Sequence, residues 1–184
     1  MTDRTIRACQ SEEEFEYIET EEELDAYLGS IVPYIGWVIV YFNSLEDHVS
    51  DFIREAILRD PIQDERLDVF LSGMLFSAKC NALIHLYGQM ISSGAVNCPH
   101  EHLNELESML AECSKRRNEY AHADWIGVKK GNFVRVKSQS KKLGIFHRYR
   151  KFEIPEIEND IVYIADARRL LCSFNDMIHD QLIR

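Results

Sequence analysis

The sequence predicts an all-α protein: a helical bundle of four to five helices with a small β-hairpin insertion before the last helix. Apolar residues recur at helical spacing over long stretches of the chain. One basic stretch, at about 128–152, instead alternates charged with apolar side chains, as hairpins do. With 184 residues and 46% hydrophobic content, the chain can bury the core of one domain. We therefore expect residues 20–184 to form a single helical domain after an acidic N-terminal arm at 1–19.

The first two predicted helices follow this arm. Thr20-Glu21-Glu22-Glu23 fits a capping box, so a helix is expected to start near Glu21. Pro33 and Gly36 are expected to divide it from a second, long helix that runs from Trp37 to Leu58. Asp60-Pro61 would end that helix, because the residue before a proline disfavours helical dihedrals.

Three more helices are predicted. The third runs from about Asp68 to Met90 and is apolar nearly all round, so we expect it to be buried on most sides, with His85 as a hydrogen-bonded core histidine. Ser92-Ser93-Gly94 forms a loop, and Pro99 suits the first turn of a fourth helix. Pro155 opens the last helix, which extends to about Leu182.

Charged residues interrupt the apolar faces of three of these helices. Arg117 continues the stripe formed by Leu103, Leu106, Leu110 and Cys113, Glu46 borders the stripe of the second helix, and Lys79 lies within the third. An unpaired charge there would cost several kcal/mol. We therefore expect Glu46, Lys79 and Arg117 to converge at the mouth of a common core. The alternative is a buried ion-pair network that only fixes helix register.

The fourth helix ends in a cluster of catalytic side-chain types, Arg117, Asn118 and His122. An imidazole can act as base or acid near neutral pH, and a guanidinium presents a planar fork that suits phosphate. Asn118 is expected to orient His122, four residues on, or to donate to the phosphate. These groups could assist attack of a ribose 2′-OH on the adjacent phosphate, which leaves a 2′,3′-cyclic phosphate and needs no metal.

The Arg-Asn-x-x-x-His pattern resembles the R-x(4–6)-H signature of the HEPN superfamily, and the run Tyr41-Phe42-Asn43-Ser44-Leu45-Glu46 resembles an earlier helix of that family. The resemblance covers about residues 34–180. It implies a homodimer of helical bundles that cleaves RNA in a composite cleft at the twofold axis.

HEPN proteins serve as toxins of toxin–antitoxin pairs, in abortive infection and in CRISPR-associated defence. The resemblance therefore implies an antitoxin or regulatory protein as a partner and RNA, tRNA included, as substrate. His122 is followed by Ala123 and Asp124 rather than by the His-x-Tyr of members that an antitoxin adenylylates, so this sequence departs from that subgroup. The alternative function is that of a catalytically inactive bundle that binds RNA, a nucleotide or a partner protein.

Charge is distributed unevenly. The net charge of −10 argues against a general nucleic-acid binder, yet residues 115–151 carry twelve basic and two acidic side chains. A basic hairpin beside the motif could hold an RNA backbone, although a merely solvated basic hairpin has the same composition. The arm is expected to be disordered or a solvated helix, with a self-inhibiting RNA mimic as the alternative. The RNA-binding candidates are Arg116, Lys129, Lys130, Arg135 and Lys137.

The remaining features predict a cytoplasmic protein that needs neither cofactor nor metal. The five cysteines are scattered without a CxxC pair, which suits a reducing compartment. His100 and His102 follow Cys98, but they would point to opposite sides of a helix and suit few zinc sites. The longest apolar run, Ile31 to Phe42, contains Pro33 and Gly36 and is too short to span a bilayer, so no membrane association is expected.

Overall fold

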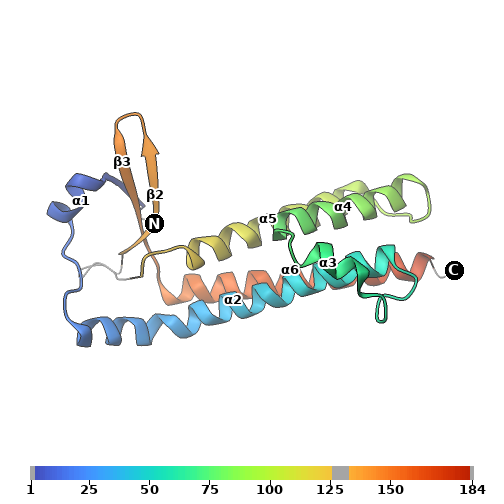
Figure 1. Ribbon diagram of the computed structural model, residues 1–184, viewed down its shortest axis with the longest axis horizontal. Helices are drawn as coiled ribbons and strands as arrows, with labels where there is room; N and C mark the ends of the chain where they lie inside the picture. Colours follow the sequence, from blue (N-terminus) through green and yellow to red (C-terminus); the bar gives the residue numbers. More distant parts are fainter. Residues whose placement is uncertain (1–2, 126–132, 183–184) are drawn as a thin grey trace. The chain divides into compact units, whose positions relative to one another are not determined.

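The computed structural model describes residues 3–125 and 133–182 (Figure 1). These residues are mostly helical, which confirms the predicted dominance of helices, and they also contain a three-stranded antiparallel sheet. The elements in chain order are β1 (Arg4–Arg7), α1 (Ala8–Glu14), α2 (Glu21–Ile57), a 3₁₀ turn (Glu65–Leu67), α3 (Asp68–Leu71), α4 (Phe76–Ser92), α5 (His100–Ala121), β2 (Phe133–Lys141), β3 (Gly144–Lys151) and α6 (Ile154–Leu182).

The chain divides into two compact units. Residues 1–39 and 116–161 include the strands and are called the sheet unit here, whereas residues 40–115 and 162–184 form the helical unit. Helices α2, α5 and α6 contribute residues to both units.

The helical unit has an aliphatic core at the spacing that the sequence predicted. Its buried side chains include Phe42, Leu45, Val49, Ile53, Leu83, Leu106, Leu110, Cys113, Ile164, Leu171 and Ile178. Buried polar groups there are paired: Tyr87 Oη donates to Asn175 Oδ1 at 2.7 Å, and Asn175 Nδ2 donates to Glu55 Oε2 at 2.9 Å. These bonds offset the desolvation of the hydroxyl and the amide.

The predicted division at Pro33 and Gly36 is wrong, because α2 continues through both residues. A proline keeps a helical φ but lacks the N–H that would bond to the carbonyl of Gly29. Gly29 and Pro33 are both exposed, so water can satisfy that carbonyl. The uninterrupted helix contains a stretch long and apolar enough to cross a membrane, of which 22% is buried. This is weak evidence, since core helices of soluble proteins pass the same test.

The predicted third helix is two helices. α3 ends at Leu71, where Gly73 N–H donates to Phe70 O and Met74 N–H to Leu71 O, and α4 starts again at Phe76. Leu75 between them has extended backbone dihedrals. The expected burial on most sides is also wrong, because Val69, Phe70 and Leu75 are exposed. His85 is exposed as well, so it is not a core histidine.

The sheet unit incorporates the N-terminal arm. β1 pairs antiparallel with β3, which also pairs with β2, giving the strand order β1-β3-β2. The expectation of a disordered or solvated helical arm is therefore wrong for Arg4–Arg7, which form β1, whereas Ala8–Glu14 are helical. Phe15 packs on Tyr149 with ring centroids 4.5 Å apart, and Tyr17 Oη lies 2.7 Å from Tyr149 Oη. Burial is the main cause that raises the pKa of Tyr149 to about 12.

Candidate functional site

The motif residues lie at the C-terminal end of α5. His122 N–H donates to Asn118 O at 3.2 Å, so the helical hydrogen-bond pattern extends one residue beyond Ala121. Asn118 and His122 are exposed, and Arg117 is half-buried. The amide and the imidazole are therefore one helical turn apart, and both are accessible to solvent.

Arg117 is linked directly to its neighbour in the motif. Its Nη1 donates to Asn118 Oδ1 at 2.9 Å. This bond uses the acceptor of the carboxamide and leaves the Nδ2 group as a donor for a ligand. Asn118 thus lies one turn before the imidazole, and the Arg117 guanidinium, about 140° around the helix from His122, is linked to it through Asn118. The role of Asn118 as an orienting group for His122 stays a prediction.

The segment after His122 is tied to the sheet. Asp124 N–H donates to Arg135 O at 2.7 Å, Arg135 N–H donates back at 3.3 Å, and the two side chains form an ion pair. Trp125 Nε1 donates to Tyr120 O at 2.9 Å. His122 lies between these anchored residues, so its backbone is restrained from both sides. Sequence reasoning missed the anchoring role of Asp124 and Trp125, and their positions directly behind His122 were the available signal.

A cluster of aromatic side chains, with Tyr120 and Phe152 buried and Trp125 half-buried, packs at the end of α5. Phe152 packs on Tyr120 and Trp125, with ring centroids 5.1 and 5.2 Å apart. Tyr120 Oη donates to Asp160 Oδ2 at 2.6 Å, and Arg116 Nη1 donates to Asp160 Oδ1 at 2.7 Å. Burial first, and then the bond to Asp160, raise the pKa of Tyr120 above its ordinary value. Asp160 in α6 is therefore a positioning residue that sequence reasoning did not identify.

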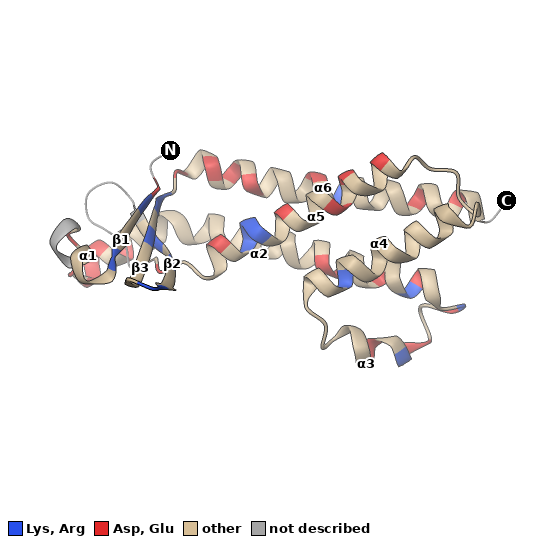
Figure 2. Ribbon diagram, turned by 90° about the horizontal axis from the view of Figure 1, so that it is seen from above, with Lys and Arg blue, Asp and Glu red and all other residues tan. Residues whose placement is uncertain are grey.

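The predicted RNA-binding residues have different surroundings. Arg116 is paired with Asp160 and Arg135 with Asp124, whereas Lys137 is exposed on β2. Lys129 and Lys130 lie outside the described residues. Figure 2 shows basic residues along the strands of the sheet. The hairpin prediction is confirmed as β2 and β3, and RNA binding by it stays a prediction.

The two supporting residues predicted from helical periodicity form an ion pair. Lys79 Nζ lies 2.7 Å from Glu46 Oε1, and the two side chains are 10% and 25% exposed. This ion pair fits both the expected convergence and the alternative of a network that only fixes helix register. Arg117 belongs to the sheet unit and this pair to the helical unit, so the three-way convergence stays a prediction.

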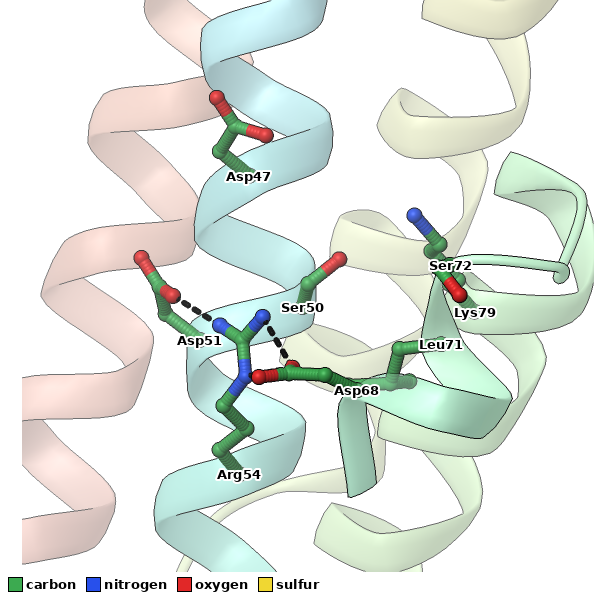
Figure 3. Close-up of a pocket in the computed structure, with 8 residues that line it drawn as sticks. All are labelled: Asp47, Ser50, Asp51, Arg54, Asp68, Leu71, Ser72 and Lys79. Atoms are coloured by element: carbon green, nitrogen blue, oxygen red, sulfur yellow. Dashed lines mark hydrogen bonds and ion pairs between the residues drawn. The ribbon is translucent and has the colours of Figure 1, made fainter. Parts of the chain in front are cut away.

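Beside this pair the helical unit has a pocket of about 470 Å³ (Figure 3). Arg54 crosses it, and both Asp51 and Asp68 bind its guanidinium. These two carboxylates neutralise the Arg54 guanidinium. Arg54 is therefore not available to bind a phosphate in this pocket. The lining residues are Asp47, Ser50, Asp51, Arg54, Asp68, Leu71, Ser72 and Lys79.

Within the described ranges, no group of three or more histidine, cysteine or acidic side chains lies close enough together to hold a metal ion. His100 and His102 are both exposed at the start of α5. Comparison with protein-family models, with curated proteins and with solved structures found no match to this chain.

Proposed function

We propose that this protein is a metal-independent endoribonuclease of HEPN type, built on a helical bundle and acting in the cytoplasm. The observation that carries the proposal is the exposed imidazole of His122 one turn beyond Asn118, whose carboxamide is bonded to the Arg117 guanidinium. Such a group of side chains offers proton transfer, a hydrogen-bond donor and a cation to one phosphodiester.

In the proposed reaction, His122 takes the proton of a ribose 2′-OH as its oxygen bonds to the adjacent phosphorus. The bond from phosphorus to the 5′-oxygen breaks, and the leaving oxygen accepts a proton from an acid. Arg117 would pair with the non-bridging oxygens, and Asn118 Nδ2 would donate to one of them. The products are a 2′,3′-cyclic phosphate and a 5′-hydroxyl end.

The reaction needs a second group that transfers a proton, and the motif offers one histidine per chain. A twofold homodimer would supply it as the partner's His122, with two motif helices facing one another. Light scattering of an active sample at micromolar concentration tests this arrangement. A monomer that retains full activity would exclude the composite site.

A catalytically inactive bundle that binds RNA, nucleotide or a partner protein is the second candidate. It is favoured by the ion pairs of two motif-region cations, Arg116 with Asp160 and Arg135 with Asp124. Under either function, the family resemblance suggests a role as a toxin or in phage defence, with an antitoxin or regulatory protein as partner.

Cleavage of total RNA and of tRNA, with analysis of the new ends, tests the proposal. His122→Ala and Arg117→Ala should each lower the rate by at least about 100-fold, because each removes a group that acts on the phosphate or its proton. The matched controls His85→Ala and Arg169→Ala alter exposed residues of the helical unit and should cleave like the parent. EDTA should have no effect. Parent-like cleavage by His122→Ala would refute the mechanism.

A further inference from the structure

A second pocket lies in the sheet unit, away from the Arg117–His122 motif. It has a volume of about 430 Å³ and is formed by β1, α1 and β3. The lining residues are Arg4, Thr5, Ile6, Arg7, Gln10 and Phe146. Two arginines and an aromatic ring thus meet in a segment whose overall composition is acidic.

Phe146 has a cation on either neighbouring strand. Arg7 lies directly opposite it in the β1–β3 register, and Arg7 Cζ is 5.9 Å from the ring centroid. Lys141 Nζ, from β2, is 5.2 Å from the same centroid. Phe146 itself is only half-buried. Both cations lie over this half-buried ring, so a planar base would stack on Phe146 by displacing one of them, and both charges would remain beside its phosphates.

The same face of the sheet leads toward the motif. Strand alternation places Arg148 on the face of Phe146, and Lys137 lies opposite Arg148 in the β2–β3 register. Arg148 Nη1 is 3.8 Å from Glu119 Oε1, and Glu119 directly follows Asn118 in α5. Arg148 also pairs with Asp3 Oδ2 at 2.7 Å, so it links the sheet to the motif helix through carboxylates, and the cations beside Phe146 are Arg7 and Lys141.

We propose that this pocket binds a nucleotide of single-stranded RNA, with its base stacked on Phe146 and its phosphates beside Arg7 and Lys141. A base inside a duplex has both faces covered by its neighbours and could not reach the ring, which excludes double-stranded RNA as the ligand. As an RNA site for the proposed nuclease, the pocket rests on the proposed function, and it would hold the strand that the motif cleaves.

The test measures binding of a short fluorescent oligouridine by anisotropy, in a His122→Ala background that prevents cleavage. Phe146→Ala should weaken binding about 10-fold, within the range of a single base stack, and Phe146→Tyr should bind like the background protein. Phe146→Leu keeps an apolar side chain for folding and should also weaken binding. The matched control Leu143→Ala removes an exposed apolar side chain from the β2–β3 turn and should have no effect.

The charge contribution is read from the salt dependence. Replacing Arg7 and Lys141 together by alanine should reduce the slope of log K against log salt by about 1.4, because each phosphate that a cation neutralises contributes about 0.7 to that slope. Lys142→Ala, which removes an exposed neighbouring cation, is the control and should leave the slope unchanged. Circular dichroism confirms that each variant is folded.

The outcomes separate this proposal from the proposed function. Parent-like binding by folded Phe146→Leu, no binding of oligouridine by the background protein, or equal binding of duplex RNA would each overturn the proposed pocket. A protein that binds oligouridine through Phe146 but does not cleave RNA would retain the pocket and refute the nuclease. Cleavage that depends on His122, with Phe146 variants that bind oligouridine normally, would support the nuclease and refute the proposed pocket.

Discussion

The two units hold their polar side chains in different ways. In the sheet unit, Asp160 accepts hydrogen bonds from both Arg116 and Tyr120, and Glu119 pairs with Arg150 from a distant strand. In the helical unit, the core is mainly aliphatic, and Lys79 is paired with a single carboxylate, Glu46. The carboxylates that hold the end of the motif helix lie in the sheet unit, so removing one of them should disturb the candidate site.

The largest expected effect is that of Asp160→Ala. It leaves the buried Tyr120 hydroxyl and Arg116 without this carboxylate and should lower the free energy of unfolding by about 3–5 kcal/mol. Urea unfolding measures the decrease, and hydrogen exchange should rise in residues 133–151 but not in 76–92. Glu158→Ala, at an exposed position of the same helix, should change little. Equal exchange increases in both segments would remove the distinction between the units.

Glu46→Ala should destabilise the helical unit by about 2–3 kcal/mol, less than expected for a fully buried pair, because Glu46 is 25% exposed. Glu46→Gln keeps the shape and a hydrogen-bond acceptor, so it should recover part of this stability. The exposed neighbour Asp47 supplies the control Asp47→Ala. If Glu46 also orients Arg117, both Glu46 variants should cleave RNA more slowly; parent-like melting and cleavage would disprove the convergence of the three charges.

A smaller effect distinguishes two tyrosines of the sheet unit. Tyr17→Phe removes the hydroxyl that bonds to Tyr149 and should cost about 1 kcal/mol. Among the described residues, the buried Tyr27 hydroxyl has no hydrogen-bond partner, and burial raises the pKa of Tyr27 to about 12. Tyr27→Phe should therefore be neutral or slightly stabilising. Thermal melts of both variants test this contrast, which would fail if Tyr27→Phe were the more destabilising.

The smallest expected effect is a difference in thiol reactivity between the cysteines of the two units, which does not alter the fold. Cys9 of the sheet unit is exposed, whereas Cys80, Cys98 and Cys113 of the helical unit are buried and its Cys172 is half-buried, with a pKa that burial raises. Burial raises the pKa of Cys80 to about 12, which disfavours the reactive thiolate. Titration with a thiol reagent should show one fast-reacting cysteine, absent in Cys9→Ser. Equally fast labelling of Cys80 would indicate that the helical unit opens readily.

Local sequence signals predicted the elements that depend on local contacts. The start near Glu21, the end of α5 at the motif and the start of α6 beside Pro155 all agree with the structure. Helical periodicity also identified Glu46 and Lys79 as charges at the edge of buried faces, and they form an ion pair. Both results follow because a helix repeats its own geometry, so side-chain positions within it can be inferred from spacing alone.

Other features had no such signal. Pro33 and Gly36 predicted the end of a helix, yet α2 continues through both residues. Gly29, whose carbonyl Pro33 leaves without an N–H donor, is exposed, so that carbonyl can bond to water. Conversely, the apolar stretch at 68–90 contains a turn at Gly73 that periodicity did not reveal.

The sequence by itself therefore determined the dominance of helices, the hairpin and the grouping of Arg117, Asn118 and His122 at the end of one helix, since each depends on residues close together in the chain. Only the tertiary structure decided that β1 joins the sheet, that Asp160 anchors the motif helix and that Arg7 meets Phe146. These contacts join segments far apart in sequence, and a single strand or carboxylate carries no local mark of its distant partner. Which strands and charges pair depends on which segments the folded chain places next to each other.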